Sequence, residues 1–600
     1  MKYLLKYMKD YRKEAILAPL FKMLEALFDL FVPLVMAALI DNGIANRDIP
    51  YIFRMCAILI LLAVAGLAIS ITAQWFSAKA ATGFAGDIRS RLFEHIQELS
   101  FSQMDIFGAD TLITRMTADV NQLQNGVNLA LRLFLRSPFV VFGSMILAFT
   151  VDVRAALIFV VAIPVLSAVV FGIMLWTMPM YRRVQEKLDK IMTGTRENLT
   201  GVRVIRAFGQ EENEIESFHE KNQDLSRMQQ FVGRISGLMN PLTYVIINLA
   251  TAWLIYAGAV RINAGYLTQG QMVALLNYMS QILVELIKLA NLIIQMTRAA
   301  ACGDRIADIL TVEPNMKDGN LTASSMEDSD TVVEFRDVSL TYEGDSGKAL
   351  DGISFSVKRG QTVGIIGGTG SGKSSLVNLI PRFYDATEGE ILVGGHDVRQ
   401  YQQEQLRSRI GVVLQKAELF KGTIADNLRW GKEDASEEEM QEALSISQAK
   451  EYVDKKPGGT SFELEQNGRN LSGGQKQRLT IARALVRKPD ILIMDDSASA
   501  LDFATDAKLR MAVRKASSSL TTFIVSQRAA SVQYADMILV MDDGKLVGSG
   551  THDELIRDNK VYQEIYYSQF PKDETGDSGK KDLTQPGAGK QDMADGKEAE

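Results

Sequence analysis

The chain has 600 residues, with 65 Lys and Arg against 72 Asp and Glu, so its formal net charge is -7. This length predicts several domains and argues against a single one. The two cysteines, Cys56 and Cys302, lie far apart, which argues against a disulfide framework or a zinc site and predicts free thiols.

The N-terminal stretch MKYLLKYMKDYRK is basic. It lacks the short apolar core and the small-residue cleavage site of a secretory signal. We expect an amphipathic helix on the membrane surface, and the alternative is an ordinary helix packed on protein.

Six apolar segments predict membrane-spanning helices, because a helix needs about 20 apolar residues to cross a bilayer. Three of them, 55–77, 155–181 and 235–260, contain no charged residue. The six predicted spans are 15–40, 55–77, 132–152, 155–181, 235–260 and 270–296. Together they predict a membrane domain over residues 1–315.

The second and fourth links between these spans, near 78–136 and 182–234, are long and carry most of the loop Lys and Arg. Loops that contain most of the Lys and Arg stay on the cytoplasmic side. We therefore expect these links, both termini and the soluble domain in the cytoplasm. The length and helical character of the links predict that the membrane helices continue well beyond the lipid.

The first span contains Lys22, Glu25 and Asp29, although charge is costly inside a bilayer and usually faces a cavity or a partner. Glu25 and Asp29 share one helix face. One interpretation is a contact with a cation or a cationic substrate. The other is exposure to water near the cytoplasmic end, or pairing with Lys22.

The composition changes after the membrane domain. Residues 316–331 are polar and contain Gly, Asn and Ser, which predicts a linker. A second domain is expected over residues 332–570, beginning with the strand-like TVVEFRDVSLTY. Residues 571–600 are charged, Gly-rich and almost free of large apolar side chains, so we expect a disordered tail.

The second domain contains a phosphate-binding motif. An apolar strand leads into Gly367-x-x-x-x-Gly372-Lys373-Ser374 and then into a helix, the context that this motif requires. Glycines turn backbone N–H groups toward phosphates, Lys373 neutralises the outer phosphates, and Ser374 offers a hydroxyl to Mg²⁺. Asp495 ends the apolar strand ILIM and is placed to reach the same Mg²⁺ through water. These motifs predict a nucleoside triphosphate, not a dinucleotide.

Between these motifs, the LSGGQ of residues 471–475 resembles the signature of ATP-binding cassette (ABC) proteins. The order of motifs agrees with that family: Tyr342, GGTGSGKS, Gln415 in VVLQK, LSGGQ, ILIMDD and SALD. Six spans before one cassette resemble one half of an exporter-type ABC transporter. The implied fold is a six-span α-helical membrane domain with long cytoplasmic helical extensions, followed by an α/β P-loop ATP-binding cassette.

The resemblance implies a set of site residues and the cofactors ATP and Mg²⁺. Two halves would pair, with each ATP held between the phosphate loop of one chain and the signature of the other. The implied ATP-binding residues are Tyr342, Gly367, Gly368, Thr369, Gly370, Ser371, Gly372, Lys373, Ser374, Ser375 and Gln415. The signature residues acting on the partner's ATP are Leu471, Ser472, Gly473, Gly474 and Gln475, the D-loop residues are Ser499 and Asp502, and the Mg²⁺ residues are Ser374, Gln415 and Asp495.

Two positions depart from the family pattern. Members that hydrolyse ATP efficiently have Glu after the Walker B Asp and His in a switch loop, whereas this chain has Asp496 and Gln527. Asp is one methylene shorter, and a misplacement of about 1 Å costs roughly 100-fold in rate. Gln527 can hydrogen-bond a γ-phosphate but cannot take a proton, and His552 lies beyond the switch loop. These changes predict a degenerate, poorly hydrolysing site; the alternative is that Asp496 works as the base.

The chain thus combines an intact signature with a site that lacks the catalytic Glu and His. This combination is expected in a heterodimer whose partner supplies the catalytic Glu and His. The pattern resembles the C subunits of heterodimeric multidrug exporters from Gram-positive bacteria, the LmrCD, BmrCD and EfrCD group. It implies ATP-driven efflux of amphipathic, drug-like compounds across a bacterial cell membrane, with weak hydrolysis by this chain alone. The expected partners are a second half-transporter, the lipid bilayer and small amphipathic substrates, and no nucleic acid. Lipid or peptide export, and an ATP-gated channel or regulatory subunit, are the alternatives.

Two segments of the long links, 108–120 and 201–214, resemble the coupling helices of the family because they follow paired spans. Coupling helices carry motion between the membrane and ATP-binding halves. The alternative for both segments is an ordinary helical hairpin.

Overall fold

The protein divides into two compact units. The computed structural model describes residues 3–322, 330–344, 346–497 and 501–570. The first unit is assigned residues 1–99 and 107–313, and the second is assigned residues 100–106 and 314–600. The expected tail at 571–600 and much of the expected linker at 316–331 lie outside the described residues.

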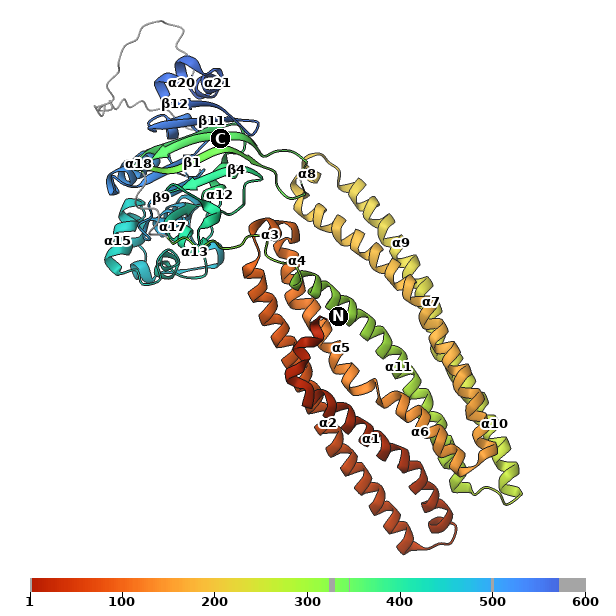
Figure 1. Cartoon of the computed structure of the whole chain (residues 1–600). Coiled ribbons are helices and arrows are strands. Elements are labelled where there is room, and N and C mark those ends of the chain that lie inside the picture. The colour runs from red at the N-terminus through yellow and green to blue at the C-terminus, as the bar shows by residue number, and fades with distance from the viewer. Residues whose placement is uncertain (1–2, 323–329, 345, 498–500, 571–600) are drawn as a thin grey trace, which may run out of the picture. The chain divides into compact units, whose positions relative to one another are not determined.

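The first unit is built from long helices (Figure 1). Its elements are η1 (Leu4–Tyr11), α1 (Arg12–Ala38), η2 (Leu39–Ile44), α2 (Ile49–Glu98), α4 (Ala109–Thr114), η3 (Arg115–Asp119), α5 (Val120–Leu133), α6 (Arg136–Val151), α7 (Val153–Thr200), α8 (Val202–Ala207), α9 (Glu211–Gly237), α10 (Met239–Asn263) and α11 (Gln269–Leu310). Among the described residues, six helical stretches are long and apolar enough to cross a membrane: Leu4–Ile44, Ile49–Glu98, Ala109–Val151, Val153–Thr200, Glu211–Asn263 and Gln269–Leu310. The six-span helical fold expected from the sequence is confirmed.

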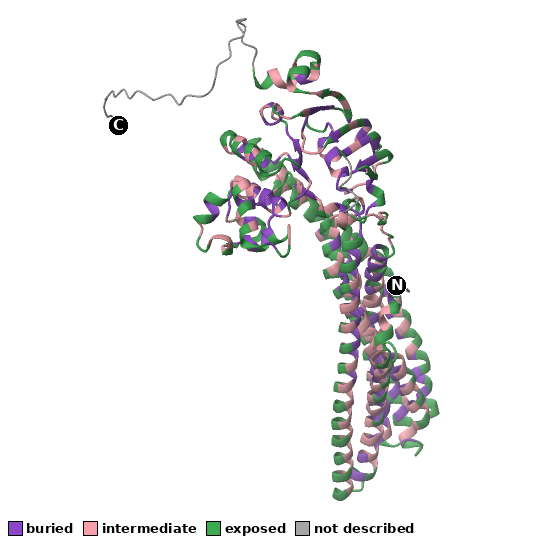
Figure 2. Ribbon diagram, turned by 60° about the vertical axis from the view of Figure 1, so that its left-hand side comes forward, coloured by how far each residue is buried: buried purple, intermediate pink, exposed green. Residues whose placement is uncertain are grey.

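Helices α2 and α7 are longer than a bilayer requires. They contain 50 and 48 residues, and a helix of this length measures about 75 Å, against a hydrocarbon core of about 30 Å. Both therefore continue well beyond the lipid, as predicted. Apolar side chains along α2, such as Ile60, Leu61 and Leu67, are exposed, and Figure 2 shows long exposed stretches on the helices of this unit. Such a surface suits contact with lipid or with another membrane helix.

Helix α11 lies at the centre of this unit's packing, because it contacts α1, α5, α6, α7 and α10. Its residues Leu275, Tyr278 and Ile282 are completely buried. The Tyr278 hydroxyl donates a hydrogen bond to the Leu30 carbonyl of α1 at 2.8 Å. Close packing and hydrogen bonds of this kind hold membrane helices together, since lipid tails are as apolar as the side chains. Cys302 of α11 and Cys56 of α2 are both free thiols, as predicted.

The N-terminal segment packs on protein, which is the alternative that the sequence left open. Leu4 in η1 is completely buried. It belongs to the same apolar cluster as Phe84 and Leu92 of α2 and Ile306 of α11. The helix η1 is therefore packed within the first unit.

The charges of the first span are paired within the protein. Lys22 forms an ion pair with Glu25, and Asp29 pairs with the Arg136 guanidinium at 2.9 Å. A second nitrogen of Arg136 donates to Glu285 at 2.6 Å, and the Glu285 side chain is only 5 % exposed. The predicted pairing with Lys22 is therefore confirmed for Glu25. Asp29 pairs with Arg136 instead.

Arg136 joins α1, α6 and α11 through its two carboxylate partners, so its removal leaves a buried charge with fewer partners. We expect Arg136→Ala to destabilise the first unit by about 3–5 kcal/mol, measured as a lower thermal unfolding temperature of the purified chain in detergent. Arg154→Ala on α7 is the matched control, because Arg154 is exposed. Equal unfolding temperatures for the two variants would show that the Arg136 pairs do not stabilise the unit.

The second unit is an α/β domain, as predicted. Its six-stranded sheet has the order β12-β11-β3-β10-β9-β6, with β12 antiparallel to β11 and the other neighbours parallel. A four-stranded antiparallel sheet has the order β2-β1-β4-β5, and β7 pairs with β8. The strands are β1 (Thr331–Leu340), β2 (Leu350–Lys358), β3 (Thr362–Gly367), β4 (Glu388–Val393), β5 (His396–Asp397), β6 (Ile410–Val413), β7 (Gly422–Thr423), β8 (Glu463–Leu464), β9 (Ile491–Asp495), β10 (Thr521–Val525), β11 (Met537–Asp542) and β12 (Lys545–Gly550).

Helices flank these sheets (Figure 1). They are α12 (Lys373–Leu379), η5 (Val398–Gln400), α13 (Gln403–Ser408), α14 (Ile424–Arg429), α15 (Glu437–Ile446), α16 (Lys450–Asp454), η6 (Gly459–Ser461), η7 (Gln466–Gly468), α17 (Gly473–Leu485), α18 (Phe503–Ala516), α19 (Ala529–Val532), α20 (His552–Asp558) and α21 (Lys560–Gln569). The short helix α3 (Phe101–Phe107) is assigned to this unit up to residue 106.

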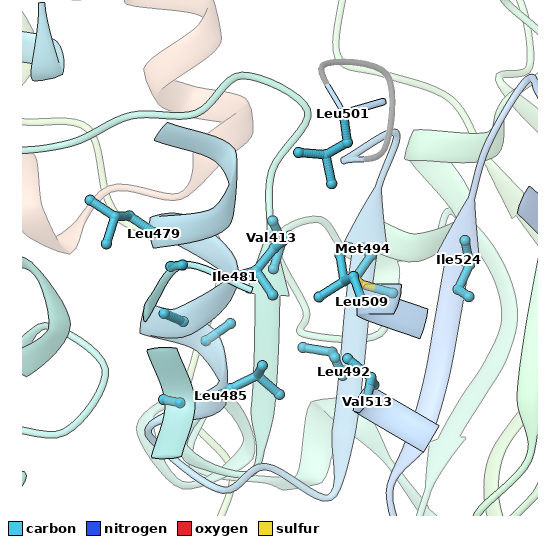
Figure 3. Close-up of a cluster of buried hydrophobic side chains, with 14 of the residues drawn as sticks. Val413, Leu479, Ile481, Leu485, Leu492, Met494, Leu501, Leu509, Val513 and Ile524 are labelled. Carbon is cyan, nitrogen blue, oxygen red and sulfur yellow. The ribbon is translucent and has the colours of Figure 1, made fainter. Parts of the chain in front are cut away.

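One apolar core fixes the signature helix α17 against the six-stranded sheet. Ile481 and Leu485 of α17 lie beside Val413 of β6 and Leu492 of β9, and α18 adds Val513 (Figure 3). These five side chains are at least 93 % buried, and burying each stabilises the fold by about 1.5–3 kcal/mol. The core therefore holds the start of α17 in a defined place relative to the sheet.

Candidate functional site

Three neighbouring strands end at one edge of the six-stranded sheet. Val525 of β10 is level with Ile365 of β3 and with Asp495 of β9. Open α/β sheets bind ligands at the carboxyl ends of their strands. The phosphate loop, Asp496 and Gln527 follow these three ends, so the topology brings them together from distant parts of the sequence.

The phosphate loop requires glycine at two tight positions. Gly372 has a φ of +90°, and a Cβ there would lie 2.7 Å from the Ala349 carbonyl oxygen. A Cβ on Gly367 would lie 2.2 Å from the Met541 carbonyl oxygen. A larger residue would therefore displace the backbone at either position.

Lys373 folds back over the phosphate loop. Its ammonium donates to the Gly367 carbonyl at 3.0 Å and to the Ser371 hydroxyl at 3.3 Å. Burial lowers the pKa of this ammonium, while the carboxylates of Asp496 and Asp495 act in the opposite direction. The loop thus holds a cation where the phosphates of a nucleotide would lie.

Ser374 and Asp495 are in contact and fit a magnesium ion. The Ser374 hydroxyl donates to a carboxylate oxygen of Asp495 at 3.0 Å. Mg²⁺ takes oxygen ligands of this kind and keeps several waters. Burial raises the pKa of Asp495, whereas the hydrogen bond from Ser374 lowers it.

One cavity of about 380 Å³ collects most of the ATP-site residues expected from the sequence. It is lined by Tyr342, Ala349, Thr369, Gly370, Gly372, Lys373, Ser374, Ser375, Gln415, Asp495, Asp496, Val525 and Gln527. Gly367, Gly368 and Ser371 belong to the same loop but are not lining residues. Among the described residues, the signature and Asp502 are not lining residues either.

Asp496 has an unusual backbone conformation. Its φ is +43°, in the left-handed region that is unfavourable for most residues and that recurs at functional sites. Burial raises the pKa of its carboxyl group, while the charges of Lys373 and Arg528 and the side chain of Gln415 lower it. Gln527, exposed, lines the same cavity.

The signature forms an exposed start of helix α17. The Ser472 hydroxyl accepts from the Gln475 N–H at 3.4 Å, and the Gln475 side chain accepts from the Ser472 N–H at 3.1 Å. This reciprocal pair is a capping box. Leu471 is buried, whereas Ser472 and Gly473 are exposed. The exposed residues are therefore accessible to a second molecule.

Two further residues considered from the sequence, Asp502 and His552, form local hydrogen bonds. Ser499 lies outside the described residues. The Asp502 carboxylate accepts from the N–H and from the hydroxyl of Thr505, both at 2.8 Å, and so caps helix α18. His552 hydrogen-bonds the Tyr562 hydroxyl at 2.7 Å and is not a lining residue of the cavity.

Tyr384 is a neighbour of the site that no sequence motif indicated. Its ring meets that of Tyr342 edge-on, with centroids 5.1 Å apart. Its hydroxyl donates to Asp105 at 2.7 Å, and the Tyr342 hydroxyl donates to Ser375 at 2.9 Å. A chain of contacts therefore leads from the phosphate-loop helix through two tyrosines to Asp105.

Asp105 belongs to a short segment of the membrane half of the sequence that packs in the second unit. Residues 100–106 are assigned to this unit, and the ring of Phe101 lies 4.7 Å from that of Phe383. The first expected coupling segment, 108–120, begins just after these residues. The coupling role of 108–120 stays a prediction.

Family models match both halves of the chain. Residues 15–286 match the ABC transporter transmembrane region, and residues 350–499 match the ABC transporter model of the ATP-binding half. The first match runs from the first span into the sixth, and the second contains the phosphate loop and the signature.

Two curated proteins and one solved structure resemble the chain over nearly its whole length. The Mycobacterium bovis ABC transporter ATP-binding protein Mb1304c is 37% identical over 94% of this chain and 97% of its own length. The Bacillus subtilis protein YgaD, named for multidrug export and as an ATP-binding/permease protein, is 32% identical over 95% of this chain and 99% of its own. A bacterial Atm1-family ABC exporter with ATP bound has the same fold, with a TM-score of 0.76, 22% identity, and coverage of 94% and 99% of the two chains.

Proposed function

The chain belongs to the ABC transporter family, and we propose that it is the degenerate-site half of a heterodimeric multidrug exporter. One membrane domain and one ATP-binding domain make it a half-transporter, which needs a second copy or a partner chain. Its ATP-binding domain makes the assembled protein an ATP-hydrolysing transporter. The finer proposal concerns the partner, the two unequal ATP sites and the substrate.

The observation that carries this proposal is the presence of Asp496 and Gln527 in the same cavity as Lys373 and Ser374. The cavity retains the groups that hold phosphates and magnesium. It has a short acid and an amide where efficient family members have Glu and His. We therefore propose that ATP binds here and is hydrolysed poorly.

The distance of the Asp496 carboxylate from the attacking water, more than its basicity, limits Asp496 as a general base. Burial raises the pKa of its carboxyl group, which by itself would make it a stronger base. A base must first come within hydrogen-bond distance of the attacking water, and the shorter side chain sets the carboxylate back. Gln527 offers a hydrogen bond to the γ-phosphate but cannot accept a proton in exchange.

The signature supports the second part of the proposal. Ser472 and Gly473 are exposed at the start of α17, and the motif is intact in LSGGQ. In the heterodimer, they would clamp ATP bound to the partner, whose Glu and His carry out hydrolysis. This chain would thus hold ATP in its own cavity and complete the active site of the other chain.

We assign residues 1–315 to the membrane domain and 332–570 to the ATP-binding domain, with the latter in the cytoplasm of a bacterial cell. The Lys and Arg residues concentrated in the long links support this orientation. The likeness to YgaD supports efflux of chemically varied amphipathic compounds. Alternating access to a cavity between the two membrane domains would then move the substrate as ATP closes the cassettes.

Purified without a partner, this chain should turn over ATP slowly while still binding it, because its own site lacks a well-placed base. The test measures steady-state ATPase activity and nucleotide binding in one detergent-solubilised preparation. Lys373→Ala is the control, since it removes the cation that faces the phosphates and should abolish binding. Rapid turnover by the isolated chain that Asp496→Asn abolishes would favour a homodimer with two working sites.

A further inference from the structure

The last residue of helix α21 holds the switch loop from outside the ATP cavity. The side-chain oxygen of Gln569 accepts from the Ala529 N–H at 2.9 Å. Its amide nitrogen donates to the Gln527 carbonyl at 2.8 Å. One planar side chain thus bonds the backbone on both sides of Arg528, in the loop between β10 and α19.

The helix that carries Gln569 is firmly anchored. Tyr562 of α21 is completely buried in the core of the α/β domain, and its hydroxyl bonds His552 at 2.7 Å. Ile565 and Tyr566 pack against the same core. The hydrogen bonds of Gln569 therefore connect the switch loop to a fixed support.

The opposite side of the same loop faces the nucleotide. Gln527 lines the ATP cavity, and its carbonyl is the group that Gln569 binds. The backbone of the loop is also tied to the sheet, because the Ser526 N–H donates to the Ile365 carbonyl at 3.0 Å. Gln527 lies between these two hydrogen-bonded positions. The orientation of its side chain therefore depends on the conformation of the loop backbone.

We infer that Gln569 is a positioning residue of the ATP site, which fixes the switch loop so that Gln527 meets the γ-phosphate. The inference rests on the proposed role of Gln527 toward the γ-phosphate. It makes α21 part of the nucleotide-sensing apparatus. Because the γ-phosphate distinguishes ATP from ADP, the loss of Gln569 should weaken binding of a triphosphate and leave that of ADP unchanged.

The test compares equilibrium binding of the non-hydrolysable triphosphate AMP-PNP and of ADP, each with Mg²⁺, to the purified full chain. Gln569→Ala should weaken AMP-PNP binding by about threefold to tenfold, the value of one net hydrogen bond, with ADP affinity unchanged. Gln569→Glu keeps an oxygen for the Ala529 N–H but sets a second carboxylate oxygen against the Gln527 carbonyl, so it should weaken AMP-PNP binding at least as much as Gln569→Ala. A residue with a purely structural role would change both affinities alike.

Gln563→Ala is the matched control on the same helix. The Gln563 amide nitrogen donates to the carbonyls of Ile556 and Arg557, so its removal perturbs the packing of α21 without touching the switch loop. It should preserve the ratio of the two affinities. If Gln563→Ala and Gln569→Ala change this ratio equally, the inference is overturned.

Gln527→Ala separates the inference from its premise. A selective loss of AMP-PNP affinity in Gln527→Ala, but none in Gln569→Ala, would overturn the positioning role alone. No selective loss in Gln527→Ala would overturn the γ-phosphate role and the inference with it. Whether the site is degenerate is decided separately, by the ATPase measurement on the isolated chain.

Discussion

The double substitution Ser472→Ala with Gly474→Asp should lower the ATPase activity of the two-chain complex by about 100-fold, the usual loss when a donor aimed at developing charge is removed. In the proposed heterodimer, these residues contact the γ-phosphate of the partner's ATP. Ser472→Ala removes a hydroxyl at the start of α17, and Gly474→Asp places a negative charge against the phosphate. An acid near a helix N-terminus does not by itself weaken the helix, so the expected loss lies in catalysis.

The fold of the chain supplies a matched control for this prediction. Ser436 forms the same capping box at the start of α15 as Ser472 forms at α17, with Glu439 as its partner. Ser436→Ala should cost about 1 kcal/mol of stability and leave the ATPase activity intact. Nucleotide binding in this chain's own cavity should survive both changes. Undiminished ATPase activity in the double variant would mean that the signature does not serve the partner's ATP.

The sequence predicted those parts of the site in which one short segment contains both the chemistry and its structural context. The phosphate loop is such a segment, because the strand before it, the glycines within it and the helix after it are contiguous. Gly372 has a φ of +90°, a backbone conformation that favours glycine, so the local sequence itself indicates the shape of the loop. Asp495 is similar, since the buried strand β9 itself delivers the carboxylate to the edge of the sheet.

Contacts between distant segments could not be predicted in this way. The Tyr384 hydroxyl meets Asp105 across 279 positions of sequence, and Gln569 reaches Gln527 across 42. Neither pair belongs to a spaced pattern, and both arise from how the α/β domain folds. The ion pair between Asp29 and Arg136 could not be predicted for the same reason, since Arg136 lies in α6, far along the chain from Asp29.

The unequal roles that we propose for the two ATP sites lead to the second large effect. In the two-chain complex, Asp496→Asn should leave ATPase activity nearly unchanged, whereas Glu→Gln at the corresponding partner position should reduce it by about 100-fold to 10,000-fold. A site whose acid stands back from the water has little catalysis to lose. Removal of the one well-placed base should lower the ATPase activity strongly, because the signature of this chain contributes no base to the partner's site.

Both variants must be compared in the same preparation, because a loss of stability imitates a loss of chemistry. The Asp496 backbone has a φ of +43°, and Asn tolerates that conformation as well as Asp does, so Asp496→Asn should unfold at the temperature of the unmodified complex. If both variants are equally stable, the ratio of their ATPase activities shows how much each site contributes to hydrolysis. Equal and large losses in both variants would assign a working base to Asp496, and the two sites would then hydrolyse ATP alike.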